Sequence, residues 1–317
     1  MWSPRCCAPC RSRREARGNV SEDVPALLPA ELRSRLRGLQ LRARHAQGAQ
    51  GIGQHASRSR GAGLEFSQYR AYEPGDALRQ IDWKLYARSD RFFVREAERE
   101  SPLTLWVLLD ATASAGQADQ ARPHYTRLQA MATLAACAAD VALRQGDQVG
   151  LFAVHGGGLV AVPAAGGPRQ RDRLWLALHG LRAGGRWPGM DAVRPLWERI
   201  AAHTLVLSIG DGFDEELVGA LEKLAAARRE VMQLQVLTCD ERDFPFDGGH
   251  RFRDPETGEE LLGDGAAMRA AYLQRFGAAQ RALQARWQAA GIAHAVHYLD
   301  APPDAALREL FAHGARR

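Results

Sequence analysis

Two short polar clusters in this sequence carry residue types that bind hard metal ions. The first reads D-A-T-A-S from Asp110 to Ser114, and the second places Asp211 between two glycines. One carboxylate and two hydroxyls at alternate positions can converge from a turning loop. With a second carboxylate they offer oxygen ligands suited to Mg²⁺ or Mn²⁺, while water fills the remaining positions. The sequence therefore predicts a candidate cation site of Asp110, Thr112, Ser114 and Asp211.

Each cluster follows a short apolar run that is typical of a buried parallel strand. Strands are expected at 103–109, 148–154, 204–208, 231–237 and 293–299, and helices at 125–144, 169–181, 191–202, 214–229 and 266–290. This alternation predicts an α/β fold with a doubly wound, mostly parallel sheet covered on both faces. Ligands of such sheets bind outside the carboxyl ends of the strands, which is where both clusters lie.

The first hundred residues differ from the rest in composition and in hydrophobic periodicity. Residues 1–24 lack periodicity and predict a disordered basic tail. The leucines of residues 25–47 are spaced as in an amphipathic helix, and 48–63 has the composition of a connector. Residues 64–100 predict two or three short strands around a turn at Glu73–Asp76. We therefore expect three parts: the tail 1–24, a helix with a β-rich segment over 25–100, and the α/β domain over 101–317.

Charge and composition bear on location and partners. The chain has 317 residues and a net charge of +5, and residues 1–60 hold 12 arginines against 4 acidic residues. No stretch is long and apolar enough for a membrane span or a signal peptide, so we expect a cytoplasmic protein. Five unevenly placed cysteines do not suggest a disulfide framework. The basic segment could attract nucleic acid, but no aromatic residues alternate with its arginines to stack on bases, which favours a solvated tail.

The D-A-T-A-S cluster resembles the metal-ion-dependent adhesion site of von Willebrand factor A domains, whose pattern is D-x-S-x-S. Thr112 replaces the first serine and keeps its hydroxyl, and Asp211 falls where that family has a later aspartate. The family also contributes a threonine from a Gly-Gly-Thr loop, whereas this chain reads Gly184-Gly185-Arg186. A guanidinium cannot ligate a cation and repels one nearby. Two alternatives follow: a bound Mg²⁺ or Mn²⁺, or a salt bridge from Arg186 to Asp110 or Asp211 that replaces it.

A longer motif lies upstream, from Glu65 to Glu100. It resembles the signature of the family called domain of unknown function 58, which runs E-F-x-x-x-R-x-Y-x-x-G-D-x-x-R-x-I-D-W-x-x-x-A-R. The matching positions are Glu65, Phe66, Arg70, Tyr72, Gly75, Asp76, Arg79, Ile81, Asp82, Trp83, Ala87 and Arg88. Residues 240–262 resemble the family as well. The resemblance implies a bacterial protein with a von Willebrand factor A-like domain. It also implies an adaptor or cofactor role beside a MoxR-type AAA+ ATPase that assembles, remodels or metallates client proteins.

The same signature has two interpretations from its residues alone. Its arginines alternate with carboxylates, and charges partly buried beside Trp83 would have to pair, giving an ion-pair network. Alternatively the segment is a recognition surface, because Trp, Tyr and Arg are the usual hot-spot residues. We interpret Asp82, Trp83 and Arg88 as structural and the turn 74–76 as exposed. The candidate surface consists of Arg70, Tyr72, Gly75, Asp76, Arg79, Asp82, Trp83 and Arg88.

Sequence motifs of the common enzyme classes are missing. The chain has no G-x-S-x-G, no H-E-x-x-H and no P-loop, so no catalytic residue is predicted. The chain is therefore expected to be a non-enzymatic protein-binding module, with a partner's carboxylate completing the cation site. One alternative is a Mg²⁺-dependent phosphohydrolase using Asp110 and Asp211, although a D-x-D motif would need an aspartate where Thr112 stands. The second alternative is nucleic-acid binding through residues 1–60.

Overall fold

The computed structural model describes residues 8–9, 27–43, 65–73, 81–98, 102–189, 191–202 and 204–314. The chain forms two compact units. The main unit comprises residues 1–49 and 103–317, and the small unit comprises residues 50–102. The segment 25–100, which we expected as one part, is thus divided between the two units.

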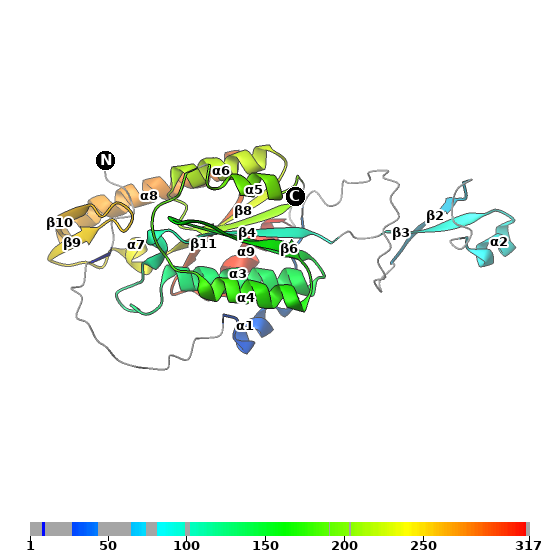
Figure 1. Ribbon diagram of the computed structural model, residues 1–317, viewed down its shortest axis with the longest axis horizontal. Helices are drawn as coiled ribbons and strands as arrows, with labels where there is room; N and C mark the ends of the chain where they lie inside the picture. Colours follow the sequence, from blue (N-terminus) through cyan, green and yellow to red (C-terminus); the bar gives the residue numbers. More distant parts are fainter. Residues whose placement is uncertain are drawn as a thin grey trace. The chain divides into compact units, whose positions relative to one another are not determined.

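A six-stranded sheet is the centre of the main unit (Figure 1). Its strands are β4 (Thr104–Asp110), β5 (Gln148–His155), β6 (Gly158–Ala165), β7 (Leu205–Gly210), β8 (Glu230–Leu237) and β11 (Ala293–Tyr298). They lie in the order β11-β8-β7-β4-β5-β6, with only β6 antiparallel to its neighbour. The chain runs outward from β4 to one edge and then from β7 to the other. This confirms the α/β class and the doubly wound, mostly parallel sheet.

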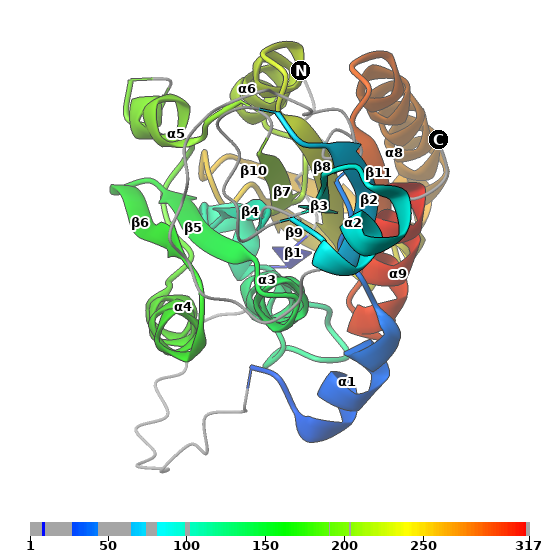
Figure 2. The ribbon, with the colours of Figure 1, turned by 90° about the vertical axis from the view of Figure 1, so that its right-hand side faces the viewer.

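Helices cover both faces of the sheet (Figure 2). They are α3 (Arg127–Arg144), α4 (Pro168–Gly180), α5 (Arg194–Arg199), α6 (Glu215–Ala226), α8 (Gly265–Ala289) and α9 (Pro303–Gly314). Side chains of α3, α4 and α9 pack in one hydrophobic cluster with one sheet face, and those of α5, α6 and α8 pack in a second cluster on the opposite face. The helix expected at 191–202 is shorter, because helical structure begins only beside Pro195, at the position where proline is best tolerated.

A third hydrophobic cluster supports a hairpin that the sequence did not predict. The hairpin consists of β9 (Gly249–Arg253) and β10 (Glu260–Asp264), and it follows the short helix α7 (Cys239–Asp243). The cluster is formed mainly by aromatic side chains: Phe244, Phe246, Phe252, Tyr272 and Phe276, with Leu237. Because these residues come from the hairpin, from α8 and from the end of β8, the cluster fastens the hairpin to the main unit.

The N-terminal segment joins the main unit through its leucines. It contains α1 (Ala30–Arg35) and the 3-10 turn η1 (Leu36–Gly38), after which the chain is extended. The helix predicted over 25–47 is therefore much shorter within the described residues 27–43. Leu32 and Leu36 still face inward and belong to the cluster of α3 and α9. Of the predicted tail 1–24, only β1 (Ala8–Pro9), paired with β9, lies within the described residues.

The small unit is an antiparallel pair of strands with a helix between them. These are β2 (Glu65–Ala71), α2 (Trp83–Ser89) and β3 (Phe93–Glu98). The two strands were predicted, but the helix was not. Asp82 begins α2, since its Oδ1 accepts hydrogen bonds from Lys84 N and Leu85 N at 2.9 and 3.1 Å. None of the helices in the described ranges of either unit is long and apolar enough to cross a membrane.

Candidate functional site

The two predicted clusters meet at the carboxyl ends of neighbouring strands. β4 ends at Asp110, and its Leu109 pairs with Ile209 near the end of β7. Between these two strands the direction of chain winding reverses, and such a point is where doubly wound sheets bind ligands. The approach is close, because a Cβ on Gly210 would lie 2.9 Å from the Cβ of Asp110. Glycine at position 210 thus lets the backbone of β7 pass beside the Asp110 side chain.

The loop after β4 folds the first cluster into a compact group of oxygens. Asp110 Oδ1 accepts a hydrogen bond from Thr112 N at 2.9 Å. The hydroxyls of Thr112 and Ser114 lie 3.2 Å apart, as the 3-10 turn η4 (Ala113–Gly116) begins. Asp110, Thr112 and Ser114 are all at least 96% buried. The spacing of the motif therefore does converge from a turning loop.

The surroundings of Asp110 disfavour the ionised form of its carboxyl group. Burial is the main reason that its pKa rises to about 7, and repulsion from Asp211 is the second. Hydrogen bonds from Thr112 act in the opposite direction and only partly offset the rise. The local charges therefore favour whatever brings positive charge, a proton or a cation, to this carboxylate.

Asp211 lies in a buried ion-pair network centred on Arg127, a residue that the motifs do not predict. Arg127 Nη1 donates to Asp211 Oδ2 at 3.0 Å, and Nη2 donates to both oxygens of Glu241 at 2.6 Å. The same guanidinium donates to Gln117 Oε1 and to the carbonyl of Ser114. Burial works to lower the pKa of Arg127, but Glu241 and Asp211 raise it more. Only 1% of the side chain is exposed, so its charge depends on these carboxylates.

Arg186 has a different partner from the one proposed from the sequence. We considered a salt bridge from Arg186 to Asp110 or Asp211, but the guanidinium that the structure pairs with Asp211 belongs to Arg127. Arg186 instead donates from Nε to the carbonyl oxygen of Glu256 at 2.7 Å. A basic residue at the start of α3, among alanines and leucines, was the available signal for a buried cation.

Glu256 is a further acidic residue at the site. It lies in the turn between β9 and β10, and its Oε1 accepts a hydrogen bond from the hydroxyl of Thr112 at 3.1 Å. The two residues are 144 positions apart in the chain. The D-P-E-T-G sequence from Asp254 to Gly258 is a recognisable turn, but nothing in its composition indicates that the turn reaches β4.

The donor set fits a hard divalent cation. Carboxylate and hydroxyl oxygens are the ligands that Mg²⁺ and Mn²⁺ prefer, and the charge balance at Asp110 favours a cation. Within the described residues no three Asp, Glu, His or Cys side chains are grouped closely enough to hold a metal by themselves. The hydroxyls of Thr112 and Ser114 would therefore have to share the ligation with Asp110.

The described part of the family signature shows both structural and exposed residues. Asp82 is 95% buried and accepts a hydrogen bond from the hydroxyl of Tyr69 at 3.0 Å, in addition to capping α2. Arg70 forms a salt bridge with Glu73, in which Nη1 lies 3.6 Å from Oε2. Trp83 is 58% exposed and Arg88 is exposed as well, which differs from their expected structural role. Gly75, Asp76 and Arg79 lie outside the described residues.

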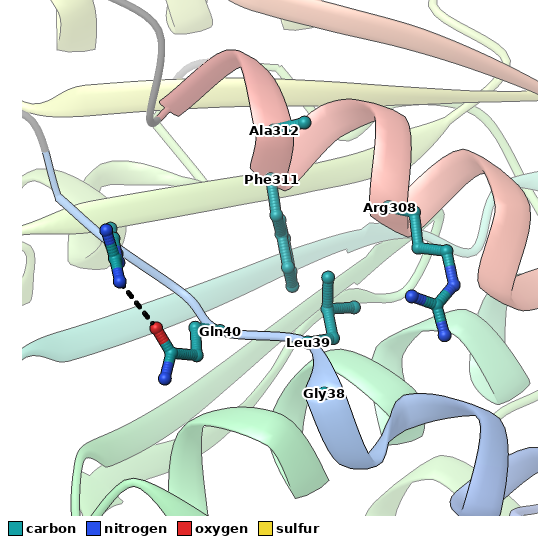
Figure 3. Close-up of a pocket in the computed structure, with 7 residues that line it drawn as sticks. Gly38, Leu39, Gln40, Arg308, Phe311 and Ala312 are labelled. Carbon is teal, nitrogen blue, oxygen red and sulfur yellow. Dashed lines mark hydrogen bonds between the residues drawn. The ribbon is translucent and has the colours of Figure 1, made fainter.

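Two hollows lie elsewhere on the main unit. A pocket of about 270 Å³ lies between the segment after α1 and helix α9 (Figure 3). Its lining residues are Gly38, Leu39, Gln40, Arg42, Arg308, Phe311 and Ala312. A larger one, of about 500 Å³, is bordered by the glycine loops 156–157 and 184–185. Neither lining includes a carboxylate, so neither provides an acidic metal ligand.

The chain is similar in sequence to an uncharacterized mycobacterial protein and in structure to several solved domains. The uncharacterized protein Rv1480 of Mycobacterium tuberculosis is 26% identical over 219 residues. The alignment covers 65% of this chain and spans 65% of the length of that relative. Among solved structures, BatB from Bacteroides thetaiotaomicron is 14% identical, with coverage of 68% of this chain and 100% of that chain and a TM-score of 0.40. The SpRpn10 VWA domain is 10% identical, with coverage of 67% and 95% and a TM-score of 0.37.

A family model agrees with the resemblance drawn from the signature. It matches residues 68–283, which is more than half of the chain and includes most of the signature, all of β4 and β7, and the β9–β10 hairpin. The chain therefore belongs to the family described as "Protein of unknown function DUF58".

Proposed function

We propose that this protein is a non-enzymatic binding module that takes up a divalent cation at the ends of β4 and β7 and recognises a protein carboxylate there. The observation that carries the proposal is the convergence of Asp110, Thr112, Ser114 and Asp211 at the point where the winding of the sheet reverses. Bound Mg²⁺ or Mn²⁺ would supply positive charge that attracts an acidic side chain.

Each residue of the site would have a separate part in binding the cation. Asp110 provides the charge that retains the cation, and the hydroxyls of Thr112 and Ser114 provide neutral oxygens beside it. Asp211 is oriented by Arg127, which holds one of its oxygens, and by Phe213 N, which donates to the other at 3.0 Å. In this proposal the four side chains serve to bind the cation and not to carry out a reaction.

The phosphohydrolase alternative has less support from these contacts. A phosphohydrolase with a D-x-D motif needs a second aspartate two positions after Asp110, and this chain has Thr112 there. Asp211 would have to act as the second carboxylate, but one of its oxygens is engaged by Arg127. The finer proposal, that the partner is a MoxR-type AAA+ ATPase, rests on the family resemblance. It is tested by co-purification of this protein with such an ATPase from the same genome.

Thermal unfolding with added Mg²⁺ or Mn²⁺ tests the cation site directly. A cation that binds only the folded chain at about 100 times its Kd should raise Tm by roughly 5–10 °C. Asp110→Asn keeps the size of the side chain and should abolish the shift. Asp172→Asn, at an exposed carboxylate of α4, is the matched control and should keep it. An equal shift in all three proteins, or no shift in the wild type, would contradict the proposal.

A further inference from the structure

The turn between β9 and β10 is built so that one carboxylate points at the candidate site. Asp254 Oδ1 accepts hydrogen bonds from Glu256 N at 2.8 Å and from Thr257 N at 3.3 Å. Gly258 closes the turn with a φ of +74°, a conformation that favours glycine, and its N–H donates to the Asp254 carbonyl. Asp254 is itself 95% buried. The backbone of Glu256 is therefore held in one conformation by its own turn.

Two hydrogen bonds of Glu256 join this turn to the site, one to its side chain and one to its backbone carbonyl. Glu256 Oε1 accepts from Thr112 Oγ1, and the Glu256 carbonyl accepts from Arg186 Nε. Arg186 is in turn well placed, because Gly184 and Gly185 exchange backbone hydrogen bonds with the loop after β4: Gly184 N donates to Ala111 O, and Ala113 N donates to Gly185 O. Arg186 thus lies where the adhesion-site pattern has threonine, and its hydrogen bond to the Glu256 carbonyl holds the turn in place.

The strand that leads into the turn is held in place by hydrophobic packing. Phe252 of β9 is fully buried in the aromatic cluster, stacked 5.5 Å from the ring of Phe244. Glu256 lies only four residues beyond Phe252, so the turn is a short, supported extension of a rigid element. The placement of its carboxylate beside Thr112 follows from the packing of the hairpin.

We propose that Glu256 is a ligand residue of the cation site, supplied by the chain itself in the place where a partner's carboxylate would otherwise bind. This inference rests on the proposed function. The hydroxyl that Glu256 contacts belongs to Thr112, one of the three side chains of the D-A-T-A-S cluster. A carboxylate at this distance from the cluster adds both a charge and two oxygen ligands to the donor set.

The consequence is a site that is closed in the free protein. An acidic residue of a partner has to displace the Glu256 carboxylate, whose side chain can rotate away while the turn holds its backbone. The partner's carboxylate therefore competes with a tethered one, which lowers its apparent affinity.

Isothermal titration of Mn²⁺ into the full-length chain tests this assignment. Glu256→Gln removes one charge and keeps the side-chain length, and it should weaken Mn²⁺ binding about tenfold. Glu259→Gln, at an exposed residue of the same turn, is the matched control and should bind like the wild type. Hydrogen–deuterium exchange of residues 254–258 gives a second readout, because Mn²⁺ should slow exchange there in the wild type and not in Glu256→Gln.

The outcomes separate this inference from the proposed function. Unchanged Mn²⁺ affinity in Glu256→Gln, together with lost binding in Asp110→Asn, would overturn the role of Glu256 and leave the cation site standing. No Mn²⁺ binding by the wild type would overturn both. Tenfold weaker binding in Glu256→Gln alone, with Glu259→Gln unaffected, is the result expected if the chain supplies its own carboxylate.

Discussion

The site at the ends of β4 and β7 is buried and polar, whereas the small unit carries an aromatic cluster that is largely open to solvent. Asp110, Thr112, Ser114 and Asp211 are each at most 4% exposed. The aromatic cluster consists of Tyr72, Trp83, Tyr86 and Phe92, with ring centroids 4.4–6.3 Å apart. Within it, Trp83 is 58% and Phe92 is 44% exposed.

The difference shows how each region can take part in binding. Buried charges have to be balanced inside the protein, so the residues of the site at the ends of β4 and β7 contribute to stability. Exposed aromatic side chains make contacts at little cost to folding and are common at protein interfaces. Substitutions should therefore destabilise the first region strongly and the second weakly.

Arg127→Met should have the largest effect. It removes the cation from a network whose carboxylates, Asp211 and Glu241, are about 98% buried or more. An uncompensated buried charge costs about 3–5 kcal/mol of the free energy of unfolding. Urea denaturation measures this loss, and Arg173→Met at an exposed position of α4 is the control. Equal stability of the two variants would mean that the network is not required for folding.

Acid should remove a stabilising contribution that the buried side chain of His297 makes to the main unit. Burial lowers the pKa of His297 on β11 to about 4, and Asp300 only partly opposes this. The folded-state pKa lies below the unfolded value of 6.5, so the contribution to stability is complete above pH 6.5 and is lost as pH falls toward 4. At pH 5 the loss is about 2 kcal/mol.

His297→Gln should remove the contribution of His297 and leave that of His294, whose pKa burial also lowers to about 4. Between pH 7 and pH 5 the unfolding free energy of the variant should therefore fall by about 2 kcal/mol less than that of the wild type. His179→Gln, at an exposed residue of α4, should behave like the wild type. The described ranges of the small unit contain no histidine, which restricts the effect to the main unit. Parallel pH profiles of wild type and His297→Gln would refute the assignment.

Neighbouring residues of the small unit should give the smallest effects and differ from each other. Asp82→Ala removes the cap of α2 and should cost about 1 kcal/mol. Trp83→Ala changes a side chain that is mostly in solvent and should cost about 0.5 kcal/mol or less. Hydrogen–deuterium exchange of residues 81–98 measures both, and Asp82→Asn should keep the cap. A larger effect of Trp83→Ala would identify the aromatic cluster as a structural core.

The periodicity of the sequence was enough to predict most of the main unit. The strands at 103–109, 148–154, 204–208, 231–237 and 293–299 are all present, because buried parallel strands are short, continuous apolar runs. β6, α9 and several shorter or more polar elements escaped prediction. β9 and β10 alternate only weakly, and α2 lies among aromatic residues that also suit strands.

The sequence by itself determined the class of fold and the position of Asp110, Thr112, Ser114 and Asp211 at the ends of strands. Those features depend on local patterns, namely an apolar run and the polar residues directly after it. Only the tertiary structure decided their partners. Arg127 meets Asp211 and Glu241 across 84 and 114 residues, and Glu256 meets Thr112 across 144. The packing of helix α3 and of the β9–β10 hairpin against the sheet brings these side chains into contact. A local sequence pattern cannot predict such pairs, because the partner of a buried charge depends on which residues the fold places beside it.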